Sequence, residues 1–397
     1  MDTRELVGRV LFEDGYGAYL EIRELAESRK IYLASTHNLY LARGEGKVAA
    51  DFTVPAVNLR GMTYQSAKTM LQVAKEVAGF FIFEIAKSEM EYTEQMPMEY
   101  AAEILGAAID VGWEGPIFLQ GDHFQFASEG DVDKMKKLVD EALMAGFYNI
   151  DIDGSTLVAL DEPSVMEQQR VNISVTGQML KYLREREGDQ LVSVGGEIGH
   201  IGERNSRASE MEVFLSGIKQ ANSDKMAFLS KVSVQTGTRH GGVVNKDGET
   251  QEMEIDMKVI DECGKVAREM GVGGVVQHGA STLTDTQLKR FVEHDTLEIH
   301  LATGWQNMIM DHPSFPLELR REMEGRMVKE YGHKYNSPEE CIYRERKRAW
   351  GKFQREVWQI PDHTVDEIMR SLKDRARMIL VELGMQNKYK LLREYTE

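Results

Sequence analysis

Eight short apolar runs alternate with longer amphipathic stretches between about residue 48 and residue 305, and this alternation constrains the fold more than any other feature. In the amphipathic stretches, such as TYQSAKTMLQVAKEVA, apolar residues recur at steps of three and four, which is typical of helices packed on one face. The apolar runs predict buried strands, so the segment consists of repeated βα units. The runs lie near residues 49–58, 79–86, 115–123, 148–154, 190–199, 231–241, 272–279 and 296–304.

Eight βα units favour an α/β fold of the closed (β/α)8 TIM-barrel type. An open doubly wound sheet uses the same alternation, but it usually carries a glycine-rich fingerprint after its first strand, and the sequence has none there. A chain of 397 residues with 42% hydrophobic content can bury such a core. We predict three parts: an N-terminal extension over residues 1–47 with one helical stretch, a catalytic barrel over residues 48–309, and a charge-rich helical C-terminal extension over residues 310–397.

Composition disfavours two classes of partner. The formal charge of −17 disfavours binding to nucleic acid, whose phosphates attract clustered lysine and arginine. No run approaches the roughly 18 apolar residues that a membrane span needs. The charged start MDTRELVGRVLFEDG also lacks the order of a secretory signal. We therefore expect a cytoplasmic protein with no membrane partner, in which Cys263 and Cys341 are free thiols.

Three histidines close predicted strands: His123, His240 and His278. In a barrel the active site lies at the C-terminal ends of the strands, so side chains remote in sequence converge there. Any one of these histidines alone is more simply explained as a hydrogen-bonded residue of the barrel rim. Three at the same end favour a zinc ion instead, because three neutral imidazoles leave one coordination position open for a substrate.

Carboxylates fall in the same layer of the predicted barrel. Asp122 directly precedes His123, and neighbouring strand residues point to opposite faces, so only one of the two would enter the site unless the strand has ended. Asp153 and Glu197 close two further strands. Asp153 could simply accept from turn amides, and Glu197 could pair with a basic neighbour. Beside a metal, both could instead orient ligands or exchange protons with a substrate.

Glycine-rich turns follow the last three predicted strands, with HGGVV at 240–244, HGAST at 278–282 and LATG at 301–304. Glycine lets backbone amides approach an anion, and the loops after the last two strands of such barrels usually bind phosphate. Each turn alone is a weak signal, because glycine is a common turn residue. Beside the histidines, the three turns are consistent with a phosphorylated substrate.

Six short motifs resemble, in order, those of the class II fructose-bisphosphate aldolase family over roughly residues 50–305. They are PAVN at 55–58, GDH at 121–123, IDGS at 152–155, EIG at 197–199, RHGG at 239–242 and HGAST at 278–282. The resemblance implies a zinc-dependent lyase of carbohydrate metabolism. Such an enzyme reversibly cleaves a phosphorylated ketose, fructose 1,6-bisphosphate or a related ketose phosphate, through a metal-stabilised enolate. Members of the family are commonly homodimers or larger homo-oligomers.

The resemblance implies a role for each matching position. His123, His240 and His278 would bind the zinc ion, and Asp122 would be the acid/base group acting on the hydroxyl at the cleaved bond. The remaining matches are Glu197 and Asp153 at the metal, Asn58 at the substrate, and Gly241, Gly279, Ser281 and Thr303 in a phosphate cradle with a sodium or potassium ion nearby.

Departures from the family pattern alter the expected substrate. The family's last strand ends in NVDT or NIDT, whereas this chain reads HLAT. His300 thus replaces an asparagine expected to contact the enolate, and Ala302 replaces an aspartate at the substrate. The paired glutamates of EAELG have become GGEIG. In the loop HIGERNSRASEME, Glu203 is the candidate proton-abstracting carboxylate and Glu210 the reserve. We therefore expect a related ketose phosphate or a different aldehyde partner.

Two other functions fit parts of the sequence. A non-catalytic aldolase-like subunit that binds sugar phosphate and supports a partner would explain the changes at His300 and Ala302. Such a subunit, however, has little physical need for an open metal site. A barrel hydrolase would use zinc to activate water, and it would be favoured by an HxH pair on the first strand, which the sequence lacks.

Overall fold

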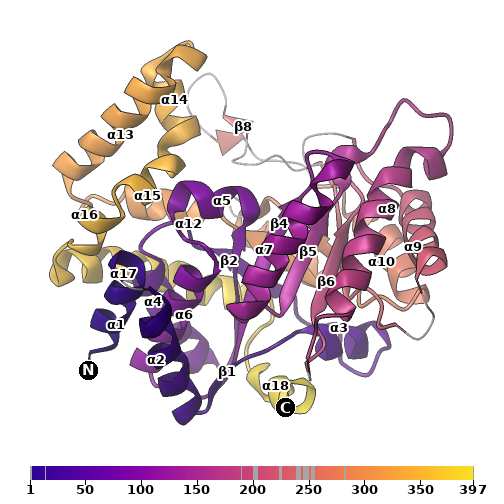
Figure 1. The fold of residues 1–397 in the computed structure, drawn as a ribbon, viewed down its shortest axis with the longest axis horizontal. Coiled ribbons are helices and arrows are strands. Elements are labelled where there is room, and N and C mark those ends of the chain that lie inside the picture. Colours follow the sequence, from indigo (N-terminus) through magenta and orange to yellow (C-terminus); the bar gives the residue numbers. More distant parts are fainter. Residues whose placement is uncertain are drawn as a thin grey trace.

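The computed structural model describes residues 2–13, 15–188, 190–199, 204–222, 226–237, 243–244, 250–251, 255–280 and 283–396. Eight parallel strands close into a barrel, which confirms the predicted (β/α)8 fold (Figure 1). The strands are β2 (Val54–Asn58), β3 (Ile82–Ala86), β4 (Gly115–Gln125), β5 (Asn149–Asp153), β6 (Ser193–Glu197), β7 (Lys231–Val234), β10 (Val275–Gln277) and β11 (Glu298–Leu301). They follow this order around the barrel, and β11 pairs with β2 to close it.

The barrel strands are buried along almost their whole length, and all except the eleven-residue β4 are five residues or shorter. In β2 and β3, with the sequences VPAVN and IFEIA, every residue is buried, because one face meets the barrel interior and the other meets the helices. This double burial explains why both strands are mostly apolar rather than alternating, with Asn58 and Glu84 as the polar exceptions. A further strand, β1 (Ile31–Leu33), lies outside the ring and pairs in parallel with the first residues of β4.

Eight helices cover the outside of the barrel. Seven come after their strands in chain order: α4 (Thr63–Val77), α6 (Pro97–Asp110), α7 (Val132–Met144), α8 (Val165–Arg184), α9 (Ala208–Ala221), α10 (Met257–Glu269) and α11 (Asp285–Glu293). The eighth is α17 (Asp362–Glu382), which packs against both α4 and α11. Part of the predicted C-terminal extension therefore completes the barrel. The division into three parts at residues 47 and 309 stays a prediction.

The N-terminal region holds more structure than the single helical stretch that we predicted. It contains α1 (Thr3–Phe12), α2 (Gly15–Ser28), β1 and α3 (His37–Gly44). Helices α1 and α2 pack against each other and against α6. Gly106 on α6 allows this close approach, because a Cβ there would lie 2.5 Å from Val7 Cγ2. Each helix is amphipathic over only a few turns, so its periodicity is a weak signal in the sequence.

Between β11 and α17 the chain forms a helical segment, of which α13 and α14 project from the barrel (Figure 1). It consists of α12 (Thr303–Met310), α13 (Leu317–Tyr331), the 3-10 turn η4 (Gly332–Lys334), α14 (Pro338–Glu345), the 3-10 turn η5 (Arg346–Arg348), α15 (Ala349–Lys352) and α16 (Gln354–Trp358). Helix α15 packs on α5 (Lys87–Thr93), which directly follows β3. Gly351 makes this contact possible, because a Cβ there would lie 2.7 Å from the carbonyl oxygen of Tyr92.

The remaining described elements are short. They are the 3-10 turns η1 (Glu129–Asp131) and η2 (Ser155–Leu157), the hairpin strands β8 (Val243–Val244) and β9 (Thr250–Gln251), and the final helix α18 (Tyr389–Tyr395). Cys263 and Cys341 are buried free thiols. Within the described ranges, no helix combines the length and apolarity needed to cross a membrane.

Candidate active site and metal centre

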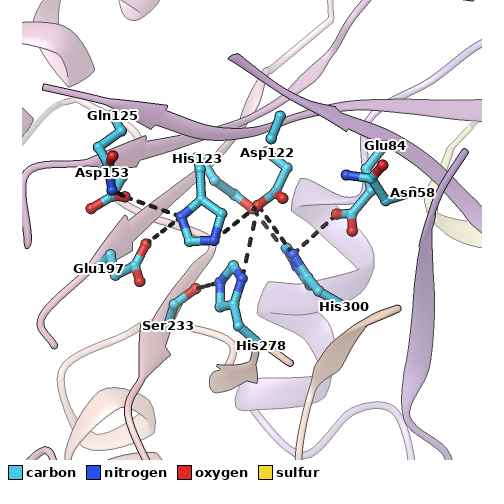
Figure 2. Close-up of polar contacts among 12 residues, drawn as sticks. Asn58, Glu84, Asp122, His123, Gln125, Asp153, Glu197, Ser233, His278 and His300 are labelled. Carbon is cyan, nitrogen blue, oxygen red and sulfur yellow. Dashed lines mark hydrogen bonds and ion pairs between the residues drawn. The ribbon is translucent and has the colours of Figure 1, made fainter. Parts of the chain in front are cut away.

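A bulge in β4 brings both Asp122 and His123 into the mouth of the barrel. The register between β4 and β5 shifts between Gly121 and Phe124, and His123 adopts a left-handed backbone conformation with a φ of 42°. A bulge re-aims side chains that would otherwise alternate between the two faces of a strand. Contrary to the expected alternation, both residues therefore line the same cavity, although β4 continues to Gln125 (Figure 2).

The imidazoles of His123 and His278 lie side by side, although one comes from β4 and the other follows β10. Their ring centroids are 4.3 Å apart (Figure 2). His123 Nε2 and His278 Nδ1 each lie 3.9 Å from the same oxygen, Asp122 Oδ1. Two of the three predicted histidine ligands thus converge, and the predicted acid/base residue lies between them.

The second nitrogen of each imidazole contacts the surrounding protein. His278 Nε2 hydrogen bonds with Ser233 Oγ at 2.8 Å. His123 Nδ1 lies 3.0 Å from Asp153 Oδ2 and 3.1 Å from Glu197 Oε2. Outer contacts of this kind set the orientation of metal-binding histidines and direct the other ring nitrogen toward the ion. Asp153 and Glu197 therefore lie behind His123, where they can orient it.

The donor set fits a divalent metal ion. Ligand atoms of Asp122, His123 and His278 lie within 4.8 Å of one another, and those of His123, Asp153 and Glu197 form a second such group. Imidazole nitrogens and carboxylate oxygens suit zinc and related divalent ions. Four predicted site residues lie outside the described residues, namely the third histidine His240, together with Glu203, Gly241 and Ser281.

Negative charge is concentrated around His123. Burial, followed by the charge of Asp153, raises the pKa of Glu197 to about 8. Burial alone would lower the pKa of His123, but the charges of Asp122 and Glu197 raise it well above its ordinary value. Three carboxyl groups therefore surround one imidazole, and a divalent cation beside them would favour the charged form of Glu197.

His300, at the position where the family has asparagine, contacts the predicted acid/base residue. Its Nδ1 lies 3.2 Å from Asp122 Oδ1 and 3.0 Å from Glu84 Oε2, and its Nε2 lies 2.6 Å from Glu298 Oε1. Its ring centroid is 4.2 Å from that of His278 (Figure 2). His300 is therefore held on both nitrogens, and its predicted contact with a substrate stays a prediction.

Below His300, the barrel interior contains a charged layer that we did not predict from the sequence. Lys231 Nζ lies 2.5 Å from Glu298 Oε1 and 3.0 Å from Asp151 Oδ2, and it donates to Gln120 Oε1 at 2.7 Å. All four side chains are buried. The sequence did carry a signal, because Asp151 and Glu298 each stand two positions before a predicted site residue. Residues two apart on a strand share a face.

A cavity of about 570 Å³ opens over these residues. Its volume lies in the range that small-molecule ligands occupy. Asn58 Nδ2 donates to Glu89 Oε2 at 2.5 Å, and Arg60 forms an ion pair with Glu89 Oε1 at 2.7 Å. Arg60, which we did not single out from the sequence, also lies 3.4 Å from Thr303 Oγ1. Seven predicted residues line the cavity: Asn58, Asp122, His123, His278, Gly279, His300 and Thr303.

The reserve candidate for proton abstraction, Glu210, contacts two arginines near the start of α9. It is buried at the start of α9, where it accepts from the backbone N–H of Arg207 at 2.8 Å and forms an ion pair with Arg204. It is not among the residues that line the cavity.

Solved aldolase structures share this fold. The YdjI aldolase from Escherichia coli K12 has a TM-score of 0.55 at 15% identity, covering 90% of this chain and 100% of that chain. A putative fructose-1,6-biphosphate aldolase from Coccidioides immitis has a TM-score of 0.55 at 14% identity, covering 90% and 99%. Fructose-bisphosphate aldolase (Fba) from Campylobacter jejuni has a TM-score of 0.52 at 17% identity, covering 90% and 96%. At such low identity, the likeness establishes the fold alone.

Sequence comparison identifies the family. No curated protein matches the chain, but the family described as "Fructose-bisphosphate aldolase class-II" matches residues 47–376. The matched range includes all eight barrel strands and every predicted site residue. The chain therefore belongs to the class II fructose-bisphosphate aldolase family, as a divergent member.

Proposed function

We propose that this protein is a zinc-dependent aldolase that reversibly cleaves a phosphorylated ketose. The observation that carries the proposal is the convergence of His123 and His278 on Asp122, with the outer nitrogen of each ring contacted by the protein. His240 would supply the third imidazole. We further propose a cytoplasmic homodimer or larger homo-oligomer with a phosphorylated sugar as its ligand.

The residues around the metal site suit aldol chemistry. When bound by these imidazoles, zinc supplies a Lewis acid for a substrate carbonyl oxygen. Asp122 would exchange a proton with the hydroxyl at the cleaved bond. His300 Nδ1, 3.2 Å from Asp122 Oδ1, would hold that carboxylate in place. Glu203 remains the proposed proton-abstracting residue.

The rim on the side of β10 and β11 suits a phosphate group. Gly279 has a φ of 74°, a conformation that glycine adopts without strain, and Thr303 is the first residue of α12. Backbone N–H groups at a helix start attract anions. We propose that these residues, with Gly241, Ser281 and a monovalent cation, bind the phosphate of the ketose, and that Asn58 contacts the sugar.

The test is zinc-dependent release of triose from a panel of ketose monophosphates and bisphosphates. Protein freed of metal by a chelator should lose cleavage, and added zinc should restore it. Turnover that persists after zinc removal would exclude a zinc-dependent reaction.

The changes at His300 and Ala302 favour one other function, a sugar-phosphate-binding subunit without catalysis. It predicts that ketose phosphates bind to the zinc-loaded protein, as measured by calorimetry, while no triose is released from any of them. Cleavage of any substrate in the panel would exclude it.

A further inference from the structure

A further group of possible metal ligands lies beside Asp122, and the proposed function does not use it. Ligand atoms of Glu84, Asp122 and His300 lie within 4.8 Å of one another. Figure 2 shows Glu84 and His300 on the far side of Asp122 from His123. All three side chains are buried and line the cavity at the mouth of the barrel, so an ion can reach them from solvent.

The separations within this group suit ligands of one ion. His300 Nδ1 lies 3.0 Å from Glu84 Oε2 and 3.2 Å from Asp122 Oδ1. Two ligand atoms at right angles, on bonds of about 2.1 Å to one ion, lie about 3.0 Å apart. The nitrogen carries at most one proton, so it cannot donate a well-aligned hydrogen bond to both oxygens. A cation between the three atoms would contact all of them.

The contacts behind His300 direct its Nδ1 toward the group. Its Nε2 lies 2.6 Å from Glu298 Oε1, and the same oxygen pairs with Lys231. A carboxylate behind a histidine holds the proton on the far nitrogen and leaves the near one as a metal ligand. Asp151, Glu298 and His300 form another possible ligand group, but the ammonium group of Lys231 already pairs with both of its carboxylates.

Two buried oxygen atoms near the group lack hydrogen-bond donors. Glu84 Oε1 and Asn58 Oδ1 accept no hydrogen bond from the residues that the structure describes. The two residues are register partners on β3 and β2, and Glu84 is 0% exposed. A buried acceptor without a donor costs free energy. A cation beside these atoms would supply the positive charge that both lack.

We infer that Glu84, Asp122 and His300 bind a second divalent cation, separate from the proposed zinc ion. Two carboxylates and one imidazole are a harder donor set than three imidazoles, and they suit manganese. Hard ions of this kind usually keep several water molecules, which leaves coordination positions for a ligand in the cavity. Asp122 would contact the ion through Oδ1, which leaves Oδ2 for the proton exchange of the proposed function.

The test titrates zinc-loaded protein with manganese chloride and measures free Mn²⁺ by electron paramagnetic resonance. The wild type should bind about one Mn²⁺ per chain and keep its zinc. Glu84→Gln and His300→Asn should each weaken Mn²⁺ binding about tenfold or more, since even the loss of a contact behind a ligand costs on this order. Asparagine is the residue that the family has at position 300, so this variant suits the barrel.

Two control variants show where the Mn²⁺ binds. Glu91→Gln removes the same charge from an exposed residue that also lines the cavity, and it should bind Mn²⁺ like the wild type. Glu197→Gln alters the ligand group of His123, Asp153 and Glu197, and it should also retain Mn²⁺. Loss of Mn²⁺ by Glu197→Gln, with full retention by Glu84→Gln, would place the ion at His123 and overturn the inference.

The titration requires no turnover, so it decides the second site even if no ketose phosphate is cleaved. Zinc content, measured by elemental analysis on the same samples, shows that the mouth of each variant is folded. If Glu84→Gln loses its zinc, His300→Asn decides the question alone. No binding of Mn²⁺ to the wild type, or equal binding by the wild type and His300→Asn, would mean that protons and not a metal ion hold this group together.

Discussion

At the scale of single residues, the backbone conformation of His123 matters as much as its side chain. With a φ of 42° at the bulge of β4, its imidazole lies beside that of His278 and its Nδ1 meets Asp153. In a regular strand, residues 122 and 123 would point to opposite faces. The bulge therefore determines that carboxylate and imidazole serve one site.

Replacing His123 by alanine should abolish metal binding, because the change removes an imidazole ligand. The barrel should stay folded, because the site lies at the mouth of the barrel and outside its hydrophobic core. Elemental analysis of protein purified without chelator should find about one zinc per chain in the wild type and none in the variant. His363→Ala, which changes an exposed histidine on α17, should retain zinc. Full retention of zinc by His123→Ala would remove His123 from the ligand set.

Asp122→Ala should separate catalysis from metal binding. The variant removes the proposed acid/base carboxylate but neither imidazole. Cleavage of the preferred ketose phosphate should fall by about 100-fold or more, since general acid–base catalysis contributes on this order. Zinc content, measured on the same samples, should stay at the wild-type level. Unchanged turnover would exclude the proposed role of Asp122.

At the scale of elements, a buried carboxyl group links two barrel helices. Glu103 on α6 accepts from the backbone N–H of Tyr64, in the first turn of α4, at 3.1 Å. Helix starts leave such N–H groups without partners in their own helix. Burial raises the pKa of Glu103 from 4.5 to about 8, although the contact with Tyr64 opposes the shift.

This raised pKa predicts a pH dependence of stability. Between pH 4.5 and about 8, the folded chain keeps the proton of Glu103 and the unfolded chain loses it, so this group lowers the free energy of unfolding as pH rises. Glu103→Gln keeps an acceptor for Tyr64 and removes the titration. In urea denaturation, its stability relative to the wild type should therefore increase from about pH 5 to about pH 8.

The exposed variant Glu322→Gln on α13 serves as the control for Glu103→Gln. It should show no such change in relative stability between the two pH values. A constant difference in free energy between Glu103→Gln and the wild type would mean that the buried carboxyl group does not titrate in this range.

At the scale of the whole molecule, the barrel is closed by a helix from near the end of the chain. Helix α17 lies between α11 and α4, after the long excursion through residues 303–358. This segment packs over the carboxyl end of β3, where it contributes Lys347 to the lining of the cavity. The C-terminal region thus completes both the hydrophobic core and the mouth of the site.

Shortening the side chain of Leu372 to that of alanine should consequently destabilise the entire barrel. Leu372 is fully buried on α17, and Leu372→Ala should lower the free energy of unfolding by about 2–5 kcal/mol. Leu317→Ala, at a position that is 54% exposed, should change it by less than about 0.5 kcal/mol. Urea denaturation followed by circular dichroism measures both. A separate transition for α17, with the main transition unaffected, would show that this helix is not part of the barrel.

The fold and several site positions were predictable from the sequence because they depend on local patterns. Apolar runs and helical periodicity determined the eight βα units, and polar residues at the ends of runs marked Asp122, His123 and His278. Since all parallel strands of a barrel end on one rim, position along the strand was enough to predict that His123 and His278 lie at the same end of the barrel.

Only the tertiary structure decided the contacts that depend on register and on residues distant in sequence. The bulge that directs both Asp122 and His123 inward arises from the pairing of β4 with β5. Lys231 on β7 pairs with Glu298 on β11, and Lys347 lines the cavity near the end of β3. Each of these contacts joins two elements far apart in the sequence, and the apolar pattern of one element does not predict its contacts with the other. Local periodicity determines which face of an element is buried, whereas packing between elements determines which side chains meet.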